Sequence, residues 1–373
     1  MNPFSYGAIV KEPHFFDRKE ECQRIVATLA GGNNLVLIAP RRFGKTSLVF
    51  RVLEDLEKMD FVCSYLDFML IYSRESFISA YSKALISKQN NLQRAVQSVA
   101  SWVKGIRPKL VFDTTGNPEF SIDFTDNKVN EKTLEEILDL PEKLASDNKR
   151  YIIVFDEFQE INKLNGENFE KLLRSKIQQQ QHVNYLFLGS RTHLLSDMFN
   201  NKVRAFYNAA MLMHIGPLPQ HETVQFLINR FATSSIKIDE PTAIFLITQA
   251  GNIPYYIQLL SAEVWQNVIA SSTDIDQNLI THCAKRIVDL KSDYYYELYD
   301  RQSAYQKKLL KALSISEENV FSADYARQFR LSAVSSTQKA LSGLIESGIV
   351  EKAERRYFFS DPFFKRFLCR YTE

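Results

Sequence analysis

The stretch that decides the fold is Leu35-Val36-Leu37-Ile38-Ala39-Pro40-Arg41-Arg42-Phe43-Gly44-Lys45-Thr46-Ser47. An apolar run typical of a buried strand enters a short turn here, and a helical pattern over 48–58 follows it. A Gly-Lys-Thr between a buried strand and a helix is the context that a phosphate-binding loop requires, whereas a chance Gly-Lys-Thr in an ordinary loop lacks it. The stretch therefore predicts an α/β fold that binds a nucleotide.

The residue types of this loop suit a triphosphate. In loops of this kind backbone N–H groups surround the phosphates, and the helix that follows directs its positive end at the anion. Lys45 is expected to reach the β and γ oxygens, and the Thr46 hydroxyl to hold Mg2+. Ala39 departs from the usual GxxxxGK[ST] pattern, which has a glycine there. The loop residues expected to contact the nucleotide are Pro40, Arg41, Arg42, Phe43, Gly44, Lys45, Thr46 and Ser47.

A second motif, Tyr151-Ile152-Ile153-Val154-Phe155-Asp156-Glu157, is a fully apolar strand that ends in two acids. Acids are tolerated there if they leave the core at the carboxyl end of the strand, and in an open parallel sheet the phosphate-binding loop lies at the same edge. Asp156 is then placed to hold Mg2+, and Glu157 to polarise a water for attack on the γ-phosphate. The alternative is a buried strand with a solvated acidic cap.

The neighbouring strand, expected over 184–188, ends in Gly189-Ser190-Arg191-Thr192. A polar side chain at this strand end would lie between the two motifs, so Ser190 is the candidate for sensing the γ-phosphate or orienting the water. Arg191 is a candidate partner of phosphate or of Glu157. Serine and threonine are also favoured helix N-caps, so a purely structural strand–helix cap is the alternative.

Length and composition exclude several classes of protein. A chain of 373 residues is too long for one comfortable core, so two or three domains are expected. No apolar run approaches the roughly 20 residues of a membrane span, and the first residues lack the basic start and apolar core of a secretion signal. The four cysteines form no CxxC pair, which argues against a zinc site or a disulfide framework and fits a reducing cytoplasm.

Alternating helical and strand patterns over 1–217 indicate a mostly parallel sheet covered by helices. A hairpin-like insertion is expected at about 105–127, where turn residues separate two alternating runs. The pattern is helical over 218–300, and 301–373 shows short helices and then two strands around a charged turn, as in a winged helix. Strands of the sheet are expected at 35–38, 61–67, 151–155, 184–188 and 211–215. One helix is expected before the first strand, at 18–30, and further helices between the strands, at 48–58, 75–87, 133–146 and 168–181.

Several segments together resemble one family. They are Asn2-Pro3-Phe4, Phe16-Asp17-Arg18-Lys19-Glu20, the loop of 39–47, Asp156-Glu157-Phe158-Gln159, and the Gly-x-x-Pro of Gly251 and Pro254. In these segments the chain resembles archaeal- and bacterial-type ATPases of the AAA+/STAND group of P-loop NTPases, over nearly its whole length. The resemblance implies a P-loop ATPase core at 1–217, a helical lid at 218–300 and a C-terminal winged helix at 301–373.

The resemblance also implies roles for residues outside the loop. Phe16, Asp17 and Arg18 match the segment that borders the adenine in relatives, and Pro254 matches the lid proline that packs near the nucleotide. Without the resemblance these residues read as a helix cap and a plain helix breaker, which are the alternatives. Adenine is likewise inferred from the resemblance, and no guanine-reading Asn/Thr-Lys-x-Asp motif opposes it.

The arginines allow more than one interpretation. Asn208 stands where relatives often carry arginine, which puts in doubt an arginine finger at that position, and Arg191 and Arg204 are candidate substitutes. Arg41 and Arg42 stand inside the loop, where they would add positive charge beside a triphosphate or reach a neighbouring subunit. The alternative, for at least one of them, is a surface salt bridge.

The C-terminal segment is basic, because 301–373 contains 13 Lys and Arg against 8 Asp and Glu, a difference of five. Such a surplus permits contact with nucleic acid but is also an ordinary solvated surface. The helix expected at 335–347 is of the recognition type, whereas in relatives such domains often serve as protein–protein or lid modules. The basic residues suited to follow a DNA backbone are Lys339, Lys352, Arg355 and Arg356.

The sequence therefore predicts a cytoplasmic ATPase that uses ATP and Mg2+, releases ADP, and acts as a nucleotide-driven switch on a protein client or on DNA. In this hypothesis Ser190 reports the loss of the γ-phosphate to the lid at Pro254, and lid motion repositions the winged helix. Hydrolysis is expected to be slow without a partner, because no arginine finger is identifiable. The alternative is a non-hydrolysing, nucleotide-gated module that binds DNA or protein. Oligomers are compatible with the sequence, and a membrane partner is not expected.

Overall fold

The structure, a computed structural model, describes residues 2–9, 18–89, 91–125, 130–146, 149–164, 166–353 and 356–370. Contacts divide the chain into two units. The sheet unit consists of 18–39 and 48–215, and the helical unit consists of 1–17, 40–47 and 216–373. The loop of 40–47 thus groups by its contacts with the C-terminal part of the chain, although it connects two elements of the sheet unit.

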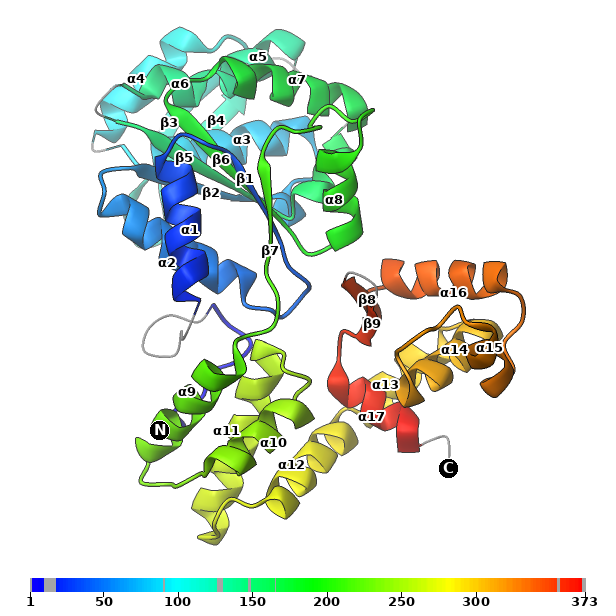
Figure 1. The fold of residues 1–373 in the computed structure, drawn as a ribbon. Helices are drawn as coiled ribbons and strands as arrows, with labels where there is room; N and C mark the ends of the chain where they lie inside the picture. Colours follow the sequence, from blue (N-terminus) through cyan, green and yellow to red (C-terminus); the bar gives the residue numbers. More distant parts are fainter. Residues whose placement is uncertain are drawn as a thin grey trace. The chain divides into compact units, whose positions relative to one another are not determined.

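A sheet of five parallel strands forms the centre of the sheet unit, in the order β2-β5-β6-β1-β7 (Figure 1). Every residue of β1, β5 and β6 is buried, as their apolar sequences require. The parallel sheet confirms the α/β class expected from the sequence. The strands are β1 (Leu35–Ile38), β2 (Val62–Asp67), β5 (Tyr151–Asp156), β6 (Val183–Gly189) and β7 (Met211–His214).

The register of the strands brings several strand ends to one edge of the sheet. Asp156, the last residue of β5, pairs with Asp67, the last residue of β2. Gly189, the last residue of β6, pairs with Ile38, the last residue of β1. Because parallel strands share one direction, Asp156, Ser190 and the loop that follows β1 all leave the sheet at its carboxyl edge.

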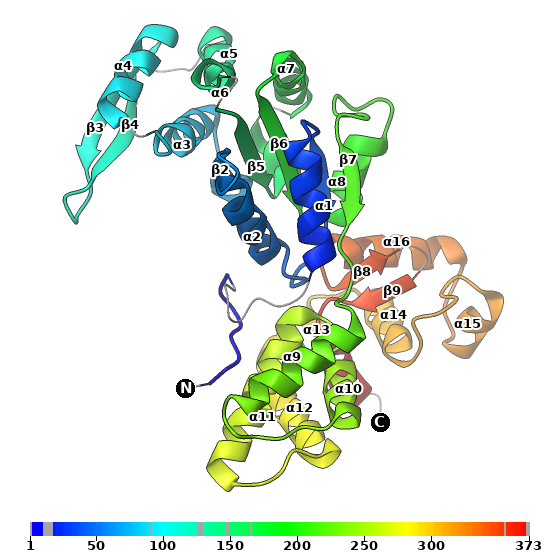
Figure 2. The same ribbon diagram turned by 60° about the vertical axis from the view of Figure 1, so that its left-hand side comes forward.

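Helices pack on the sheet and supply its covering layers (Figure 2). The helix α1 (Lys19–Ala30) lies against β1 and β6, and α3 (Arg74–Ile86) lies against β2. A capping box starts α3, because the Ser73 hydroxyl accepts a hydrogen bond from the N–H of Ser76 while the Ser76 side chain reaches back. The other helices that connect the strands are α2 (Lys45–Glu57), α4 (Leu92–Trp102), α7 (Gly166–Gln179) and α8 (Thr192–Asn200).

The prediction of one continuous helix at 133–146 is wrong. The structure has two helices there, α5 (Glu131–Leu138) and α6 (Leu140–Leu144). Pro141 lies in the first turn of α6, where its missing N–H is tolerated, whereas within a continuous helix the proline ring would break the hydrogen-bond ladder. The break therefore falls just before the proline.

The insertion expected at about 105–127 is an antiparallel hairpin of β3 (Ile106–Phe112) and β4 (Pro118–Phe124). At its tip the Asp113 carboxylate accepts hydrogen bonds from the N–H groups of Thr115 and Asn117, each 2.8 Å long. Aspartate is favoured at such turns because its side chain satisfies backbone donors of the turn itself. The hairpin is thus closed by local chemistry, as the turn sequence predicts.

Aromatic side chains fill the core between the sheet and the 3-10 turn η2 (Phe158–Leu164) that follows β5. The rings of Phe155 and Phe158 stack with their centroids 5.9 Å apart, and the ring of Phe158 lies 4.7 Å from that of Phe187. All three side chains are fully buried. This packing fixes the path of the chain immediately after β5, and with it the position of Asp156 and Glu157.

The first part of the helical unit contains α9 (Gln220–Ala232), α10 (Glu240–Gln249), α11 (Pro254–Ser271), α12 (Gln277–Leu290) and α13 (Ser292–Asp300). Gly251 has a φ of 65°, and Pro254 starts α11, so the Gly-x-x-Pro segment separates α10 from α11 as expected. Asp239 and Asp276 cap α10 and α12 through their side chains. Among the described helices, none combines the length and apolar character that a bilayer span requires.

The C-terminal part of the helical unit is the winged helix that the sequence predicts. Three helices precede two antiparallel strands that pair Val350 with Phe359. A final helix follows that was not expected, and it is held by the buried side chains of Phe363, Phe364 and Phe367, which share one face. The elements are α14 (Ala304–Ile315), α15 (Ala323–Gln328), α16 (Val334–Glu346), β8 (Val350–Ala353), β9 (Arg356–Phe359) and α17 (Pro362–Arg370).

Candidate active site

Asp156 ends β5 with its side chain almost fully buried. Its Oδ2 accepts a hydrogen bond of 2.5 Å from the hydroxyl of Tyr65, on the neighbouring strand β2, and its Oδ1 accepts one of 2.8 Å from the N–H of Glu157. Burial, and then the negative charge of Asp156, raise the pKa of Tyr65, so this hydroxyl stays protonated and donates. A buried carboxylate held by fixed donors is an oxygen ligand of the kind that Mg2+ takes.

Glu157 follows in a backbone conformation with a φ of 49°, in the left-handed region. This conformation costs about 1–3 kcal/mol for a residue other than glycine, and such strain is found where the surrounding structure fixes a residue for a purpose. Its Oε2 accepts hydrogen bonds from the Ser190 hydroxyl at 2.8 Å, from the Ser190 N–H at 3.2 Å and from Nε2 of Gln159 at 2.5 Å. The structure thus brings Ser190 to Glu157, as the strand order predicts.

Arg191, the residue after Ser190, forms a different pair from those considered in the sequence. Its Nη1 lies 3.9 Å from Oε1 of Glu160, and its side chain is 47% exposed. Glu160 also pairs with Lys163 at 2.6 Å. A long ion pair on an exposed arginine contributes little to stability, so the Arg191 guanidinium is only weakly held.

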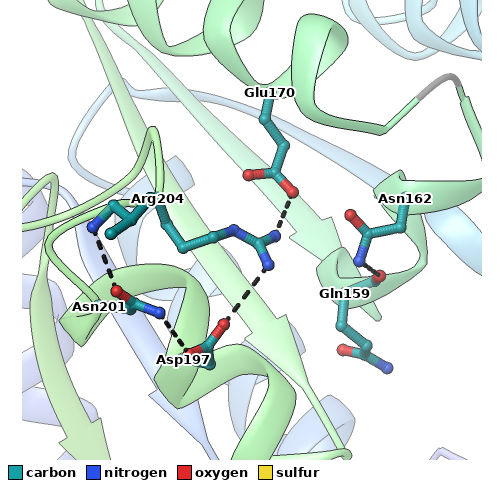
Figure 3. Close-up of polar contacts among 7 residues, drawn as sticks. Gln159, Asn162, Glu170, Asp197, Asn201 and Arg204 are labelled. Atoms are coloured by element: carbon teal, nitrogen blue, oxygen red, sulfur yellow. Dashed lines mark hydrogen bonds and ion pairs between the residues drawn. The ribbon is translucent and has the colours of Figure 1, made fainter.

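Arg204 lies between two acids of the sheet unit (Figure 3). Its guanidinium forms an ion pair with Glu170, whose side chain is 1% exposed, and a second, 3.4 Å long, with Asp197. A buried carboxylate needs such a cation, because an uncompensated charge in the interior is costly. Asn208 has a φ of 52°, a left-handed conformation that asparagine adopts more readily than most residues.

The phosphate loop begins directly after β1, at the carboxyl edge of the sheet. Ala39 is fully buried, and Gly44 has a φ of 79°. A Cβ on Gly44 would meet no described protein atom within 4 Å, so its positive φ, rather than crowding by protein atoms, calls for glycine. Lys45, Thr46 and Ser47 form the first turn of α2, with Lys45 buried and the two hydroxyl residues half-buried.

Arg42 of the loop makes a set of contacts within the helical unit. Its Nη1 lies 3.3 Å from Oδ2 of Asp361, just before α17, and its guanidinium carbon lies 5.1 and 4.9 Å from the ring centroids of Tyr255 and Tyr256. Its carbonyl accepts a hydrogen bond of 3.3 Å from the N–H of Tyr255. Cation–π contacts and an ion pair therefore fix this arginine next to Pro254 and the start of α11.

The two other large side chains of the loop face the winged helix as well. The rings of Phe43 and Phe358 lie 6.3 Å apart. Burial raises the pKa of Glu351, on β8, from its ordinary value of 4.5 to about 7, and the positive charge of Arg41 limits this rise. Arg42 is thus paired with an acid of the winged helix, Asp361, whereas Arg41 acts on Glu351 through its charge.

Asp361 directly precedes α17, whose Phe363 and Phe364 are buried. The carboxylate of Asp361 has a second use, because it also accepts the hydroxyl of Tyr295 at 3.1 Å and lies 3.8 Å from Nζ of Lys291. Nothing local in the sequence signals these contacts, since the partners are far apart along the chain.

Only part of the segment expected to bind adenine lies within the described residues. Phe16 and Asp17 lie outside the described residues, as does Arg355 of the wing. Arg18 is described, with its side chain 2% exposed and its Nη1 donating to Glu21 at 3.0 Å. Pro254 stands at the start of α11, beside the tyrosines that contact Arg42.

Two family models match the chain. One, described as an ATPase domain predominantly from Archaea, matches residues 15–258, which is well over half of the chain. The other, described as a probable winged helix domain, matches residues 293–370. No curated protein sequence matches the chain closely enough to count as a relative.

Solved structures with the same fold cover nearly the whole chain at low sequence identity. The Walker-type ATPase of Pyrococcus abyssi has a TM-score of 0.67 at 17% identity, over 98% of this chain and 99% of that one. The ORC2 protein of Aeropyrum pernix, in complexes with ADPNP and ADP, has a TM-score of 0.54 at 13% identity, over 99% of each chain. The ORC1 protein of Aeropyrum pernix in complex with DNA has a TM-score of 0.52 at 13% identity, over 96% of this chain and 94% of that one. This chain has the P-loop ATPase fold followed by a C-terminal winged helix, and it belongs to the family of ATPase domains found predominantly in Archaea.

Proposed function

We propose that this chain is an Mg2+-dependent ATPase whose nucleotide state changes how its helical lid and winged helix engage a partner. The observation that carries the proposal is the hydrogen bond of 2.8 Å between Ser190 Oγ and Glu157 Oε2, at the sheet edge from which the loop of Lys45 departs. A carboxylate oriented from a neighbouring strand is what a water-activating base requires. Membership of an ATPase family supports ATP as the nucleotide.

In the proposed reaction, Lys45 and the loop amides bind the β- and γ-phosphates at the positive end of α2. Thr46 and Asp156 supply oxygen ligands, which suit a hard cation such as Mg2+. Mg2+ held there would neutralise charge on the phosphates. Glu157 accepts a proton from the water whose oxygen bonds to the γ-phosphorus, the bond from that phosphorus to the bridging oxygen breaks, and ADP and phosphate leave. Ser190 holds the Glu157 carboxylate throughout.

The proposal extends to the residues around the nucleotide. Phe16, Asp17 and Arg18 are proposed to border the adenine and Pro254 to approach it from the lid, because they match the segments with these roles in the family that the chain resembles. Arg191 is proposed to contact the γ-phosphate, because its exposed ion pair of 3.9 Å holds it only weakly. A cytoplasmic location, and domain boundaries near 217 and 300, are further parts of the proposal.

Coupling to the rest of the chain is proposed to run through Arg42. A triphosphate carries the negative charge that Asp361 now presents to this guanidinium at 3.3 Å, so phosphate and Asp361 compete for it. Arg42 also contacts Tyr255 and Tyr256 of α11. A phosphate that draws the guanidinium away from Asp361 would therefore change contacts both in the lid and at the start of α17. This is a two-state contact that nucleotide can bias, as a switch requires.

The partner is proposed to be a protein client or DNA. DNA is supported by the exposed, small and polar start of α16, where Ser335, Ser336 and Lys339 are exposed, and by the DNA complex of the similarly folded ORC1 protein. Binding of a DNA duplex that weakens steeply with salt, and less steeply in Lys339→Ala, would support DNA. If the protein does not bind the DNA duplex even at low salt, a protein client remains as the proposed partner.

Phosphate release tests whether the chain turns ATP over. Wild-type protein with ATP and Mg2+ should release phosphate, and Glu157→Gln should reduce the rate by about 100- to 10,000-fold while a fluorescent ATP analogue still binds. Glu20→Gln, on the exposed start of α1, is the matched control and should behave like the wild type. Equal release by wild type and Glu157→Gln would instead favour a nucleotide-gated binding module that does not hydrolyse ATP.

A further inference from the structure

Gln159 is a buried residue in direct contact with the carboxylate of Glu157, the proposed base of the reaction. Its side chain is 4% exposed, and its Nε2 donates to Oε2 of Glu157 at 2.5 Å. Its main-chain carbonyl accepts a hydrogen bond of 3.4 Å from Nδ2 of Asn162, which ties it into η2 (Figure 3). The fully buried ring of Phe158 precedes it, so the backbone at this point has little freedom to shift.

The orientation of the Gln159 amide follows from chemistry. An ionised carboxylate only accepts hydrogen bonds, so the NH2 group must face Glu157 and Oε1 must face away. Among the described residues no donor reaches Oε1, which is buried. An unsatisfied buried acceptor costs about 1–3 kcal/mol, a cost that an apolar side chain of similar size would avoid. Glutamine at this position therefore calls for a function that depends on its NH2 group.

Gly189, the last residue of β6, has no side chain, and the side chain of Gln159 occupies the space that a Cβ would fill. A Cβ on Gly189 would lie 2.3 Å from Oε1 of Gln159 and 3.0 Å from a methyl carbon of Leu195. Gly189 is not among the described glycines with positive φ, so its backbone does not require glycine. Glycine in a strand costs about 0.5–1 kcal/mol relative to alanine. The approach of Gln159, and to a lesser degree that of Leu195, thus accounts for glycine here.

We propose that Gln159 is a positioning residue for ATP hydrolysis, acting through Glu157, and that Gly189 is glycine so that Gln159 can reach it. This inference rests on the proposed role of Glu157. The donors from Ser190 and Gln159 meet on one oxygen, Oε2, from two different elements. Together they fix the rotation of the carboxylate, which a strained backbone at Glu157 would not do alone. A base displaced by about 1 Å can lose about 100-fold in rate, so this support decides the turnover number.

A double-mutant cycle tests the proposal. Gln159→Met, which keeps the length of the side chain and removes the donor, should lower kcat by about 10- to 100-fold and change the affinity for a fluorescent ATP analogue by less than about twofold. Gly189→Ala should produce a similar loss in the wild-type background. In a Gln159→Ser background, where the short side chain leaves room for the Cβ, Gly189→Ala should have no further effect on kcat.

Controls separate positioning from general damage. Asn162→Ala removes only the 3.4 Å contact to the Gln159 carbonyl, while the buried ring of Phe158 still holds the backbone and the Gln159 side chain is unchanged, so kcat should stay within about threefold of the wild type. Melting temperatures without nucleotide provide a readout that is independent of activity, and Gly189→Ala should lower the melting temperature less in the Gln159→Ser background than in the wild type.

Particular outcomes overturn the role. Unchanged kcat in Gln159→Met, or an equal loss from Gly189→Ala in both backgrounds, would contradict it. So would a loss of nucleotide affinity as large as the loss in kcat. Wild-type protein that releases no phosphate would overturn the proposed function and this role with it, whereas wild-type turnover with an unaffected Gln159→Met would overturn this role alone.

Discussion

Nη1 of Arg42, in the phosphate loop, lies 3.3 Å from Oδ2 of Asp361, a residue 319 positions further along the chain. Both residues belong to the helical unit, and the same carboxylate oxygen accepts the hydroxyl of Tyr295 at 3.1 Å. The Arg42 backbone has a φ of 71°, so the loop holds a strained conformation while the side chain reaches this acid. A cation placed where phosphate is expected is thus already paired with an acid of the winged helix.

Removing the charge of Asp361 should strengthen ATP binding. Asp361→Asn keeps Oδ1, which accepts the N–H of Phe363 at 2.9 Å, and removes the competitor for Arg42. Because Arg42 is 38% exposed, the gain should be no more than about two- to fivefold in affinity. Titration with a fluorescent ATP analogue measures it. Asp324→Asn, at a site 91% exposed on α15, is the control, and weaker binding by Asp361→Asn would contradict the competition.

Glu351 should make stability fall as the pH rises. Burial raises the pKa of this carboxyl from 4.5 to about 7, so folding favours its protonated form. That contribution is fully present below pH 4.5, declines between about pH 4.5 and pH 7, and is absent above. Glu351→Gln should therefore be more stable than the wild type at pH 8, by up to about 3 kcal/mol, and nearly equal to it at pH 4.

Urea unfolding at the two pH values measures the difference. Glu346→Gln, at an exposed position of α16, is the matched control and should show no dependence on pH beyond that of the wild type. A Glu351→Gln protein that is less stable than the wild type at pH 8 would show that the carboxylate, in the field of the Arg41 charge, stabilises the folded state.

Tyr65→Phe should weaken the response to Mg2+. The hydroxyl of Tyr65 fixes Oδ2 of Asp156 at 2.5 Å, and loss of a hydrogen bond to a metal-ligating group commonly costs about 10- to 100-fold in metal affinity. The Mg2+ concentration that gives half-maximal phosphate release should rise by about tenfold. Tyr72→Phe is the control, because Tyr72 is 82% exposed. An unchanged Mg2+ dependence in Tyr65→Phe would separate Asp156 from the metal.

Arg204→Ala should damage stability more than catalysis. The substitution leaves the buried Glu170 without its arginine, and breaking a buried pair in this way costs about 3 kcal/mol. Arg191→Ala, which loses only a 3.9 Å pair, should cost less than about 0.5 kcal/mol. Urea unfolding compares the two. If Arg204→Ala instead keeps its stability and loses phosphate release, Arg204 acts on the nucleotide.

The sheet and the meeting of Glu157 with Ser190 could be predicted from the sequence, and the reasons are local. Buried strands read as apolar runs, and the ends of parallel strands share one edge, so Ser190 after β6 had to lie near the acids after β5. The phosphate loop could be identified from its Gly-Lys-Thr between a buried strand and a helix, and the winged helix from short helices followed by two strands around a charged turn. The roles given to Lys45, Thr46 and Asp156 stay predictions.

Other features had no local signal. The pairing of Arg42 with Asp361 depends on how distant segments pack, and no spacing in the sequence encodes it. Gln159 stood inside the quoted Asp156-Glu157-Phe158-Gln159 motif, yet its use depends on the absence of a side chain at Gly189 on another strand. The helix α4 did have a local signal, because Leu92, Ala95, Val96 and Val99 recur at helical spacing, and the sequence analysis missed it.

The central claim is that the phosphate loop and the acid at the end of β5 serve one ATP–Mg2+ site. Affinity for a fluorescent ATP analogue, measured with and without Mg2+ in the wild type, Lys45→Ala and Asp156→Asn, tests it most directly. Mg2+ should strengthen binding to the wild type, Lys45→Ala should lose binding in both conditions, and Asp156→Asn should bind with no benefit from Mg2+. An Asp156→Asn protein that gains from Mg2+ as much as the wild type does would contradict the claim.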